Sequence, residues 1–176
     1  MKRLIAVLIP ILSFITLNVN AQKIKWYKFE EGMKVAEKQK KKVFIDVFTD
    51  WCGYCVKMDK TTFMDKDVVE YMNENYIAIK FDAESIDTIS WKGYTFKNPN
   101  PTGRRSTNEL AAALLNNKLS YPSYVLFDEN QVGITIIPGY MPKTRFLPIM
   151  HFIKEDAYKT TKFEDYLKKY NEKNNG

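Results

Sequence analysis

The two cysteines of this chain, Cys52 and Cys55, lie three positions apart and directly after a short apolar run. The run, residues 43–48, is rich in β-branched side chains and predicts a buried strand. The pair therefore lies where a strand passes into a helix. Two thiols at this spacing can interconvert between a dithiol and a disulfide, and their position beside a strand–helix pattern is typical of a redox motif.

Two other interpretations of the cysteine pair are open. The pair could form one structural disulfide, although a bridge that closes so short a loop restrains the unfolded chain little. It could also supply half of a zinc site, but zinc needs four ligands, and the one histidine, His151, lies far along the sequence. Spacing and ligand count both favour redox chemistry.

The positions of the two cysteines suggest separate roles. At a helix start, unpaired amides and the helix dipole favour negative charge, so the pKa of Cys52 should fall and its thiolate should attack a disulfide. Cys55 lies one turn further along the same face and can displace the bond that Cys52 forms. Gly53 would let a substrate approach closely, while Trp51 would shield one side or belong to the core.

The N-terminal residues predict a secretory signal peptide over 1–21. Lys2 and Arg3 precede an apolar stretch over 4–17, and cleavage is expected near Ala21. The stretch is shorter than the roughly 20 residues of a membrane-spanning helix, which disfavours a retained anchor. The signal peptide therefore predicts a periplasmic or secreted protein, and export would place the cysteine pair in an oxidising compartment, where disulfides persist.

Length indicates a single domain over residues 22–176, which is long enough to bury a core. The formal net charge is +6, and the basic residues are dispersed. No basic stripe with interleaved aromatic residues appears, so we expect no nucleic-acid partner. No heptad repeat predicts a dimer seam, which favours a monomer, and no motif indicates a metal or other cofactor.

Hydrophobic periodicity predicts an α/β fold. The first half should contain a helix over 26–40, a strand over 43–48, a helix from Cys52, a helix capped by Asp65 and a strand over 76–82. A strand, a helix and a second strand at this spacing imply a parallel pair with a crossover.

The second half begins with a long insertion, at about 84–119. Within it we expect a hairpin around Gly93, and a short helix that starts with a capping box from Ser106 to Glu109. The remaining elements are antiparallel strands over 124–128 and 132–137, a helix over about 142–155, and a C-terminal helix over about 161–173.

Together these features resemble the thioredoxin-like family over about residues 26–155. The family's W-C-G-x-C motif matches residues 51–55, and its buried, proton-accepting aspartate falls at Asp46, six residues before the first cysteine. The lysine that the family places near this aspartate falls at Lys80. The resemblance implies these catalytic residues: Cys52, Cys55, Asp46 and Lys80.

Two further landmarks lie in the second half. Tyr121 and Pro122 precede the third core strand, as the family's cis-proline does, and Gly139 follows the fourth. A cis turn would leave the Tyr121 backbone free to pair with an extended substrate, whereas a trans proline would simply begin the strand. The resemblance implies these substrate-contacting residues: Trp51, Gly53, Tyr54, Tyr121, Pro122 and Gly139.

The charged landmarks also have a direct physical interpretation. A carboxylate at Asp46, within an apolar strand, is costly to bury. Burial should raise the pKa of Asp46, which suits a group that moves a proton to or from Cys55. Alternatively, Asp46 faces a polar spot and is only structural, and Lys80 is a surface lysine on its strand.

The resemblance implies a thioredoxin fold: a central mixed sheet of four or five strands flanked by helices, with the insertion between the second and third core strands. It implies a thiol–disulfide oxidoreductase that acts on cysteine-containing exported proteins as a reductase or isomerase-like exchanger. A reductase would need a membrane electron donor. The alternative function is a non-catalytic binding module with a structural disulfide. The insertion, which carries Arg104 and Arg105, would be a lid, a partner surface or a decorative subdomain.

Overall fold

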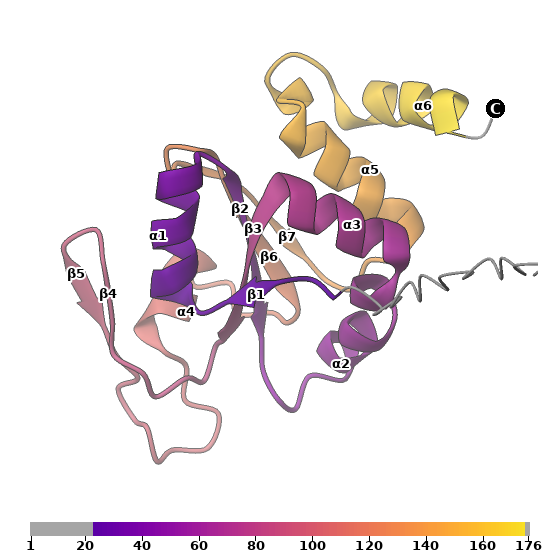
Figure 1. Ribbon diagram of the computed structural model, residues 1–176. Coiled ribbons are helices and arrows are strands. Elements are labelled where there is room, and N and C mark those ends of the chain that lie inside the picture. The colour runs from indigo at the N-terminus through magenta and orange to yellow at the C-terminus, as the bar shows by residue number, and fades with distance from the viewer. Residues whose placement is uncertain (1–22, 175–176) are drawn as a thin grey trace, which may run out of the picture.

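A central five-stranded sheet organises the computed structural model, which describes residues 23–174 (Figure 1). The predicted signal peptide lies outside the described residues. The strands are, in spatial order, β1 (Trp26–Tyr27), β3 (Tyr76–Asp82), β2 (Lys42–Phe48), β6 (Ser123–Phe127) and β7 (Gly133–Pro138). β1 and β2 run parallel to β3, while β6 is antiparallel to both β2 and β7. The mixed sheet confirms the predicted fold class.

Helices cover both faces of this sheet (Figure 1). One face packs against α1 (Phe29–Gln39) and α4 (Glu109–Leu114), and the other against α2 (Gly53–Lys60), α3 (Lys66–Asn75) and α5 (Lys143–Lys154). The last helix, α6 (Phe163–Asn174), packs on α5, and short 3₁₀ turns occur at η1 (Thr62–Met64) and η2 (Ala157–Lys159). Among residues 23–174, no helix combines the length and apolar character needed to cross a bilayer.

The central strand β2 is buried because both of its faces are covered. Side chains alternate along a strand, so Val43, Ile45 and Val47 pack toward α1 and α4, while Phe44 packs toward α2, α3 and α5. By the same alternation, Asp46 lies on the face that α2 covers. The strand pattern therefore places the one acidic residue of β2 on the side of the cysteine-bearing helix.

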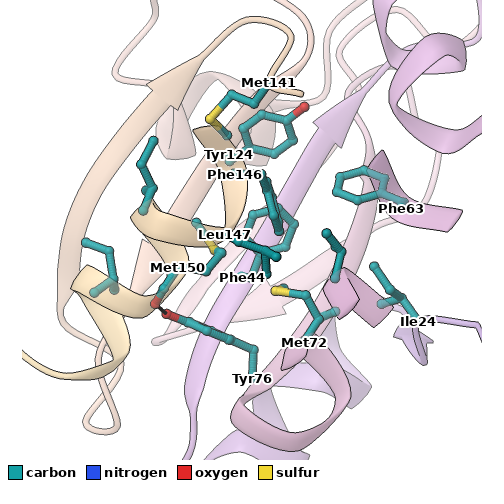
Figure 2. Packing of buried hydrophobic residues seen from close by; sticks show 14 of the residues in the cluster. Ile24, Phe44, Phe63, Met72, Tyr76, Tyr124, Met141, Phe146, Leu147 and Met150 are labelled. Atoms are coloured by element: carbon teal, nitrogen blue, oxygen red, sulfur yellow. Dashed lines mark hydrogen bonds between the residues drawn. The ribbon is translucent and has the colours of Figure 1, made fainter. Parts of the chain in front are cut away.

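Aromatic side chains fill the core on the α2–α3–α5 face (Figure 2). Phe44 stacks on Tyr124 with ring centroids 5.3 Å apart, and Phe63 and Phe146 present their edges to it. At the lower end of this layer, the Tyr76 hydroxyl donates a hydrogen bond of 2.6 Å to the Met150 carbonyl oxygen (Figure 2). This bond ties α5 to β3.

Two sequence predictions of local structure are wrong in detail. The first helix begins at Phe29 rather than residue 26, because Trp26 and Tyr27 pair with β3 as an edge strand. The helix of the insertion is capped by Asn108, whose side-chain oxygen accepts from the Leu110 amide at 2.9 Å, and not by Ser106. The Ser106 hydroxyl is engaged elsewhere, donating to Asn98.

The insertion leaves the sheet directly after β3. It contains the expected hairpin, formed by β4 (Ile89–Trp91) and β5 (Tyr94–Phe96), and then a loop that leads to α4. Because β2 and β3 are parallel, their carboxyl ends share one edge of the sheet. The insertion therefore starts at the same edge from which the chain runs into the cysteine pair.

Candidate active site

The cysteine pair lies at the N-terminus of α2, where Cys52 is the N-cap residue. Cys52 and Cys55 are joined in a disulfide, and the backbone amide of Cys55 donates to the sulfur of Cys52 at 3.1 Å. In the dithiol form, the same amide and the helix dipole would stabilise a thiolate on Cys52. The local structure thus supplies the electrostatic setting that the helix-start position predicted.

The exposure of the pair is small. Cys52 is 5 % exposed and Cys55 is 3 % exposed, whereas Trp51 is 50 % exposed and Tyr54 is more exposed still. The two cysteines are therefore buried, while the aromatic residues next to them in the sequence are exposed. A Cβ placed on Gly53 would meet nothing within 4 Å, so the space over the helix start is open.

His151, considered above as a zinc ligand, lies on α5 and stacks on Tyr71 with ring centroids 3.9 Å apart. In the part of the chain that the structure describes, no group of three or more His, Cys, Asp or Glu side chains is placed to hold a metal ion.

Asp46 and Lys80 lie opposite one another on β2 and β3. The Asp46 carboxyl is 2 % exposed, and its Oδ2 lies 3.6 Å from Lys80 Nζ. Its other oxygen has no hydrogen-bond partner within residues 23–174. Burial raises the pKa of Asp46 to about 7, because Lys80 offsets only part of the desolvation cost. A carboxyl with that pKa can accept or donate a proton near neutrality.

Asp59, on α2, is a member of this charge cluster that sequence reasoning missed. Lys80 forms an ion pair and a hydrogen bond with Asp59, in addition to its longer contact with Asp46. The negative charge of Asp59 further raises the pKa of Asp46. Its position four residues after Cys55 places it one turn further along the helix, a signal visible in the sequence, but its pairing with β3 depends on how α2 crosses the sheet.

The Tyr121–Pro122 peptide bond is cis and lies at the start of β6. Because β6 is antiparallel to β2, this start lies at the edge where β2 ends. The Pro122 carbonyl accepts from the Gly139 amide at 2.8 Å, and Gly139, just after β7, has a φ of 94°. That left-handed conformation suits a glycine. The residues predicted from the resemblance to contact substrate therefore lie at the start of α2 or on loops, all at the edge of the sheet where β2 ends.

Two aromatic contacts involve residues next to the cysteines in the sequence. The rings of Trp51 and Tyr121 meet edge to face with centroids 5.9 Å apart. The ring centroids of Tyr54 and Tyr140 lie 6.1 Å apart, and the Lys57 amine lies 4.4 Å from the centroid of Tyr140.

Two residues of the insertion contact Trp51, and no sequence signal identified either contact. The Trp51 indole N–H donates to Glu84 Oε1 at 2.9 Å. The Arg105 guanidinium carbon lies 4.7 Å from the centroid of the same ring. The insertion is therefore in direct contact with the residue that precedes Cys52.

The protein family described as "Thioredoxin-like domain" matches residues 29–154 of this chain. An uncharacterized protein of Archaeoglobus fulgidus is 34% identical over 58 residues, which are 33% of this chain and 46% of that protein. The thiol:disulfide interchange protein DsbD of Colwellia psychrerythraea is 33% identical over 61 residues, 35% of this chain and 10% of that protein. The matched stretches span less than half the length of these relatives.

Solved structures show the same fold. A thioredoxin-fold protein from Helicobacter pylori has a TM-score of 0.54 at 24% identity, covering 75% of this chain and 80% of that one. A putative disulphide-isomerase from Bacteroides thetaiotaomicron has a TM-score of 0.51 at 22% identity, covering 76% and 93%. A thioredoxin from Thermus thermophilus has a TM-score of 0.56 at 16% identity, covering 75% and 88%. At these identities the likeness is one of fold.

Proposed function

The chain belongs to the thioredoxin-like domain family, and from that premise we propose that it is a thiol–disulfide oxidoreductase of exported proteins. One observation carries the proposal. The Cys52–Cys55 pair begins α2 on the face of the sheet where a buried carboxyl, Asp46, has a pKa raised to about 7. A structural disulfide has no need of a buried acid that is costly to ionise, whereas disulfide exchange needs a group that handles a proton.

The proposed reaction has two exchange steps. The Cys52 thiolate attacks one sulfur of a client disulfide, forming a mixed disulfide and releasing the other client sulfur as a thiolate. Cys55 then gives its proton to Asp46 and attacks the Cys52 sulfur, which releases the second client sulfur. The client disulfide is reduced to two thiols, and the chain is oxidised to the Cys52–Cys55 disulfide.

The direction of exchange and the location are further parts of the proposal. We place the protein in the periplasm or outside the cell, where it acts as a reductase or an isomerase-like exchanger. In an oxidising compartment the dithiol must be regenerated, so the proposal includes a membrane electron donor that reduces the Cys52–Cys55 disulfide. A measured reduction potential near the strongly oxidising value of about −120 mV would instead assign the protein to disulfide formation.

Trapping of a client would test the proposed chemistry. In Cys55→Ser the resolving thiol is gone, so mixed disulfides on Cys52 should accumulate when the reduced protein meets oxidised exported proteins. Cys52→Ser, the matched control, should trap far less. Reduced wild type should also reduce insulin, and the absence of both insulin reduction and trapped clients would refute the proposal.

The low exposure of Cys52 favours a second candidate, a binding module with a structural disulfide. The two candidates differ in their response to reductant. An inert bridge would resist mild dithiothreitol, and neither cysteine would become available to a thiol label in the native protein. An exchanging pair would be reduced readily, and Cys52 would be labelled faster than Cys55.

A further inference from the structure

The loop of the insertion that faces the redox site is held in place by Asn98, a buried side chain that is 8 % exposed. Its amide donates to the carbonyl oxygens of Glu84 at 3.1 Å and Ser106 at 2.9 Å. Its side-chain oxygen accepts hydrogen bonds from the Ser106 hydroxyl and from the backbone amide of Asn100. These bonds close the loop over residues 98–106 and fasten it to the segment that follows β3.

Arg105 is directed toward the redox site by this anchoring. It precedes Ser106 in the loop and has a φ of 58°, a left-handed conformation that is uncommon for a residue with a side chain. Such a conformation persists where neighbouring contacts determine it. Its guanidinium lies over the Trp51 ring, which is itself fixed by the hydrogen bond to Glu84 and by the edge contact with Tyr121.

The hydrogen-bonding capacity of this guanidinium is unused within the described chain. No hydrogen bond or ion pair joins the Arg105 side chain to another residue of 23–174, and Arg105 is exposed. Stacking on an aromatic face leaves the N–H groups in the guanidinium plane available, and their fork geometry matches a carboxylate. The Arg105 guanidinium is therefore a cation held in place beside Trp51, with N–H donors that are free to bind another group.

We infer that Arg105 is a specificity-determining residue that binds a carboxylate of the client. The client class is an extended segment that carries Asp or Glu within a few residues of the reacting cysteine. When the client sulfur reaches Cys52, a neighbouring part of the segment must cross the exposed Trp51 ring, and Arg105 lies over that ring. This inference rests on the proposed function and assigns the insertion a part in substrate selection.

Three peptides that share one disulfide and differ at a single position near it, with Glu, Gln or Lys, would test the inference. The reduced full-length protein should reduce the Glu peptide about two- to fivefold faster than the Gln peptide at low salt, the range expected of an exposed ion pair. The Lys peptide should be slowest. The preference should shrink at high salt, because salt screens exposed charges.

Arg105→Ala should abolish the Glu-over-Gln preference while leaving the rate for the Gln peptide nearly unchanged. Arg105→Lys should retain part of the preference, since the charge remains and the bidentate geometry is lost. Lys118→Ala, which removes an exposed cation elsewhere in the insertion, should leave the preference intact.

Two results would overturn the inference while leaving the proposed function standing. In the first, Arg105→Ala slows all three peptides equally, so that Arg105 acts on Cys52 or Trp51 rather than on the client. In the second, wild type shows no preference among the peptides. A failure of wild type to reduce any peptide would refute the proposed function, and the inference with it.

Discussion

Replacing Asp46 by Asn should raise the free energy of unfolding of the protein, and this increase should become larger as the pH rises. The Asp46 carboxyl is 2 % exposed, and one of its oxygens has no hydrogen-bond partner within residues 23–174. It is faced by Lys80 on β3, by Asp59 on α2, and by Tyr124, its cross-strand neighbour on β6. Burial raises its pKa from 3.8 to about 7, so the charged form is unfavourable in the native protein.

The sign of the effect follows from proton linkage. The native protein binds the Asp46 proton more tightly than the unfolded chain does, so this group favours folding below pH 4 and loses that contribution as the pH rises through about 7. A pKa difference of this size corresponds to about 4 kcal/mol. An Asn side chain at position 46 carries no charge at any pH. The free energy of unfolding of Asp46→Asn should therefore exceed that of wild type by about 4 kcal/mol at pH 8 and by about 2 kcal/mol at pH 5.

Urea denaturation of the oxidised proteins at pH 5 and pH 8 measures this difference directly. The control is Asp87→Asn, which removes an exposed carboxylate from the insertion and should leave the free energy of unfolding nearly unchanged at both pH values. A gain for Asp46→Asn that is equal at the two pH values, or larger at pH 5, would refute the argument that Asp46 is destabilised by the burial of its charge.

Two further substitutions test individual contacts. Asp59→Asn should release Lys80 toward Asp46 and so lower the pKa of Asp46. The pH dependence of the rate at which Cys55 resolves the mixed disulfide should then move to lower pH. An unchanged pH dependence would show that Asp59 does not act on Asp46. Tyr76→Phe should lower the free energy of unfolding by about 1–2 kcal/mol, because the Met150 carbonyl loses its hydroxyl donor in the core. Urea denaturation measures the second effect, and a change near zero would mean that water or another donor replaces the hydroxyl.

Strands and motifs that depend on local pattern could be predicted from the sequence. The apolar run over 43–48 predicted β2, the strand–helix transition placed Cys52 at a helix start, and the turn at Gly93 predicted the hairpin. These features are encoded by side chains within a few residues of one another. Asp65 likewise caps α3 through its own neighbouring amides, as expected.

Contacts between distant segments could not be predicted in this way. The pattern around Trp26 fits a helix, yet Trp26 and Tyr27 form an edge strand because they pair with β3. Nor does local sequence indicate that Asn98 would hold a loop so that Arg105 reaches Trp51.

Short-range spacing and hydrophobic alternation are enough to locate the cysteine pair, the acid buried on the neighbouring strand and the order of the elements in the sequence. Two features follow from the three-dimensional packing alone: Asp59 competes with Asp46 for Lys80, and the insertion contacts Trp51 beside the redox site. The first depends on how α2 crosses the sheet, and the second on parallel strands whose carboxyl ends lie at one edge of the sheet and bring together residues far apart in the chain.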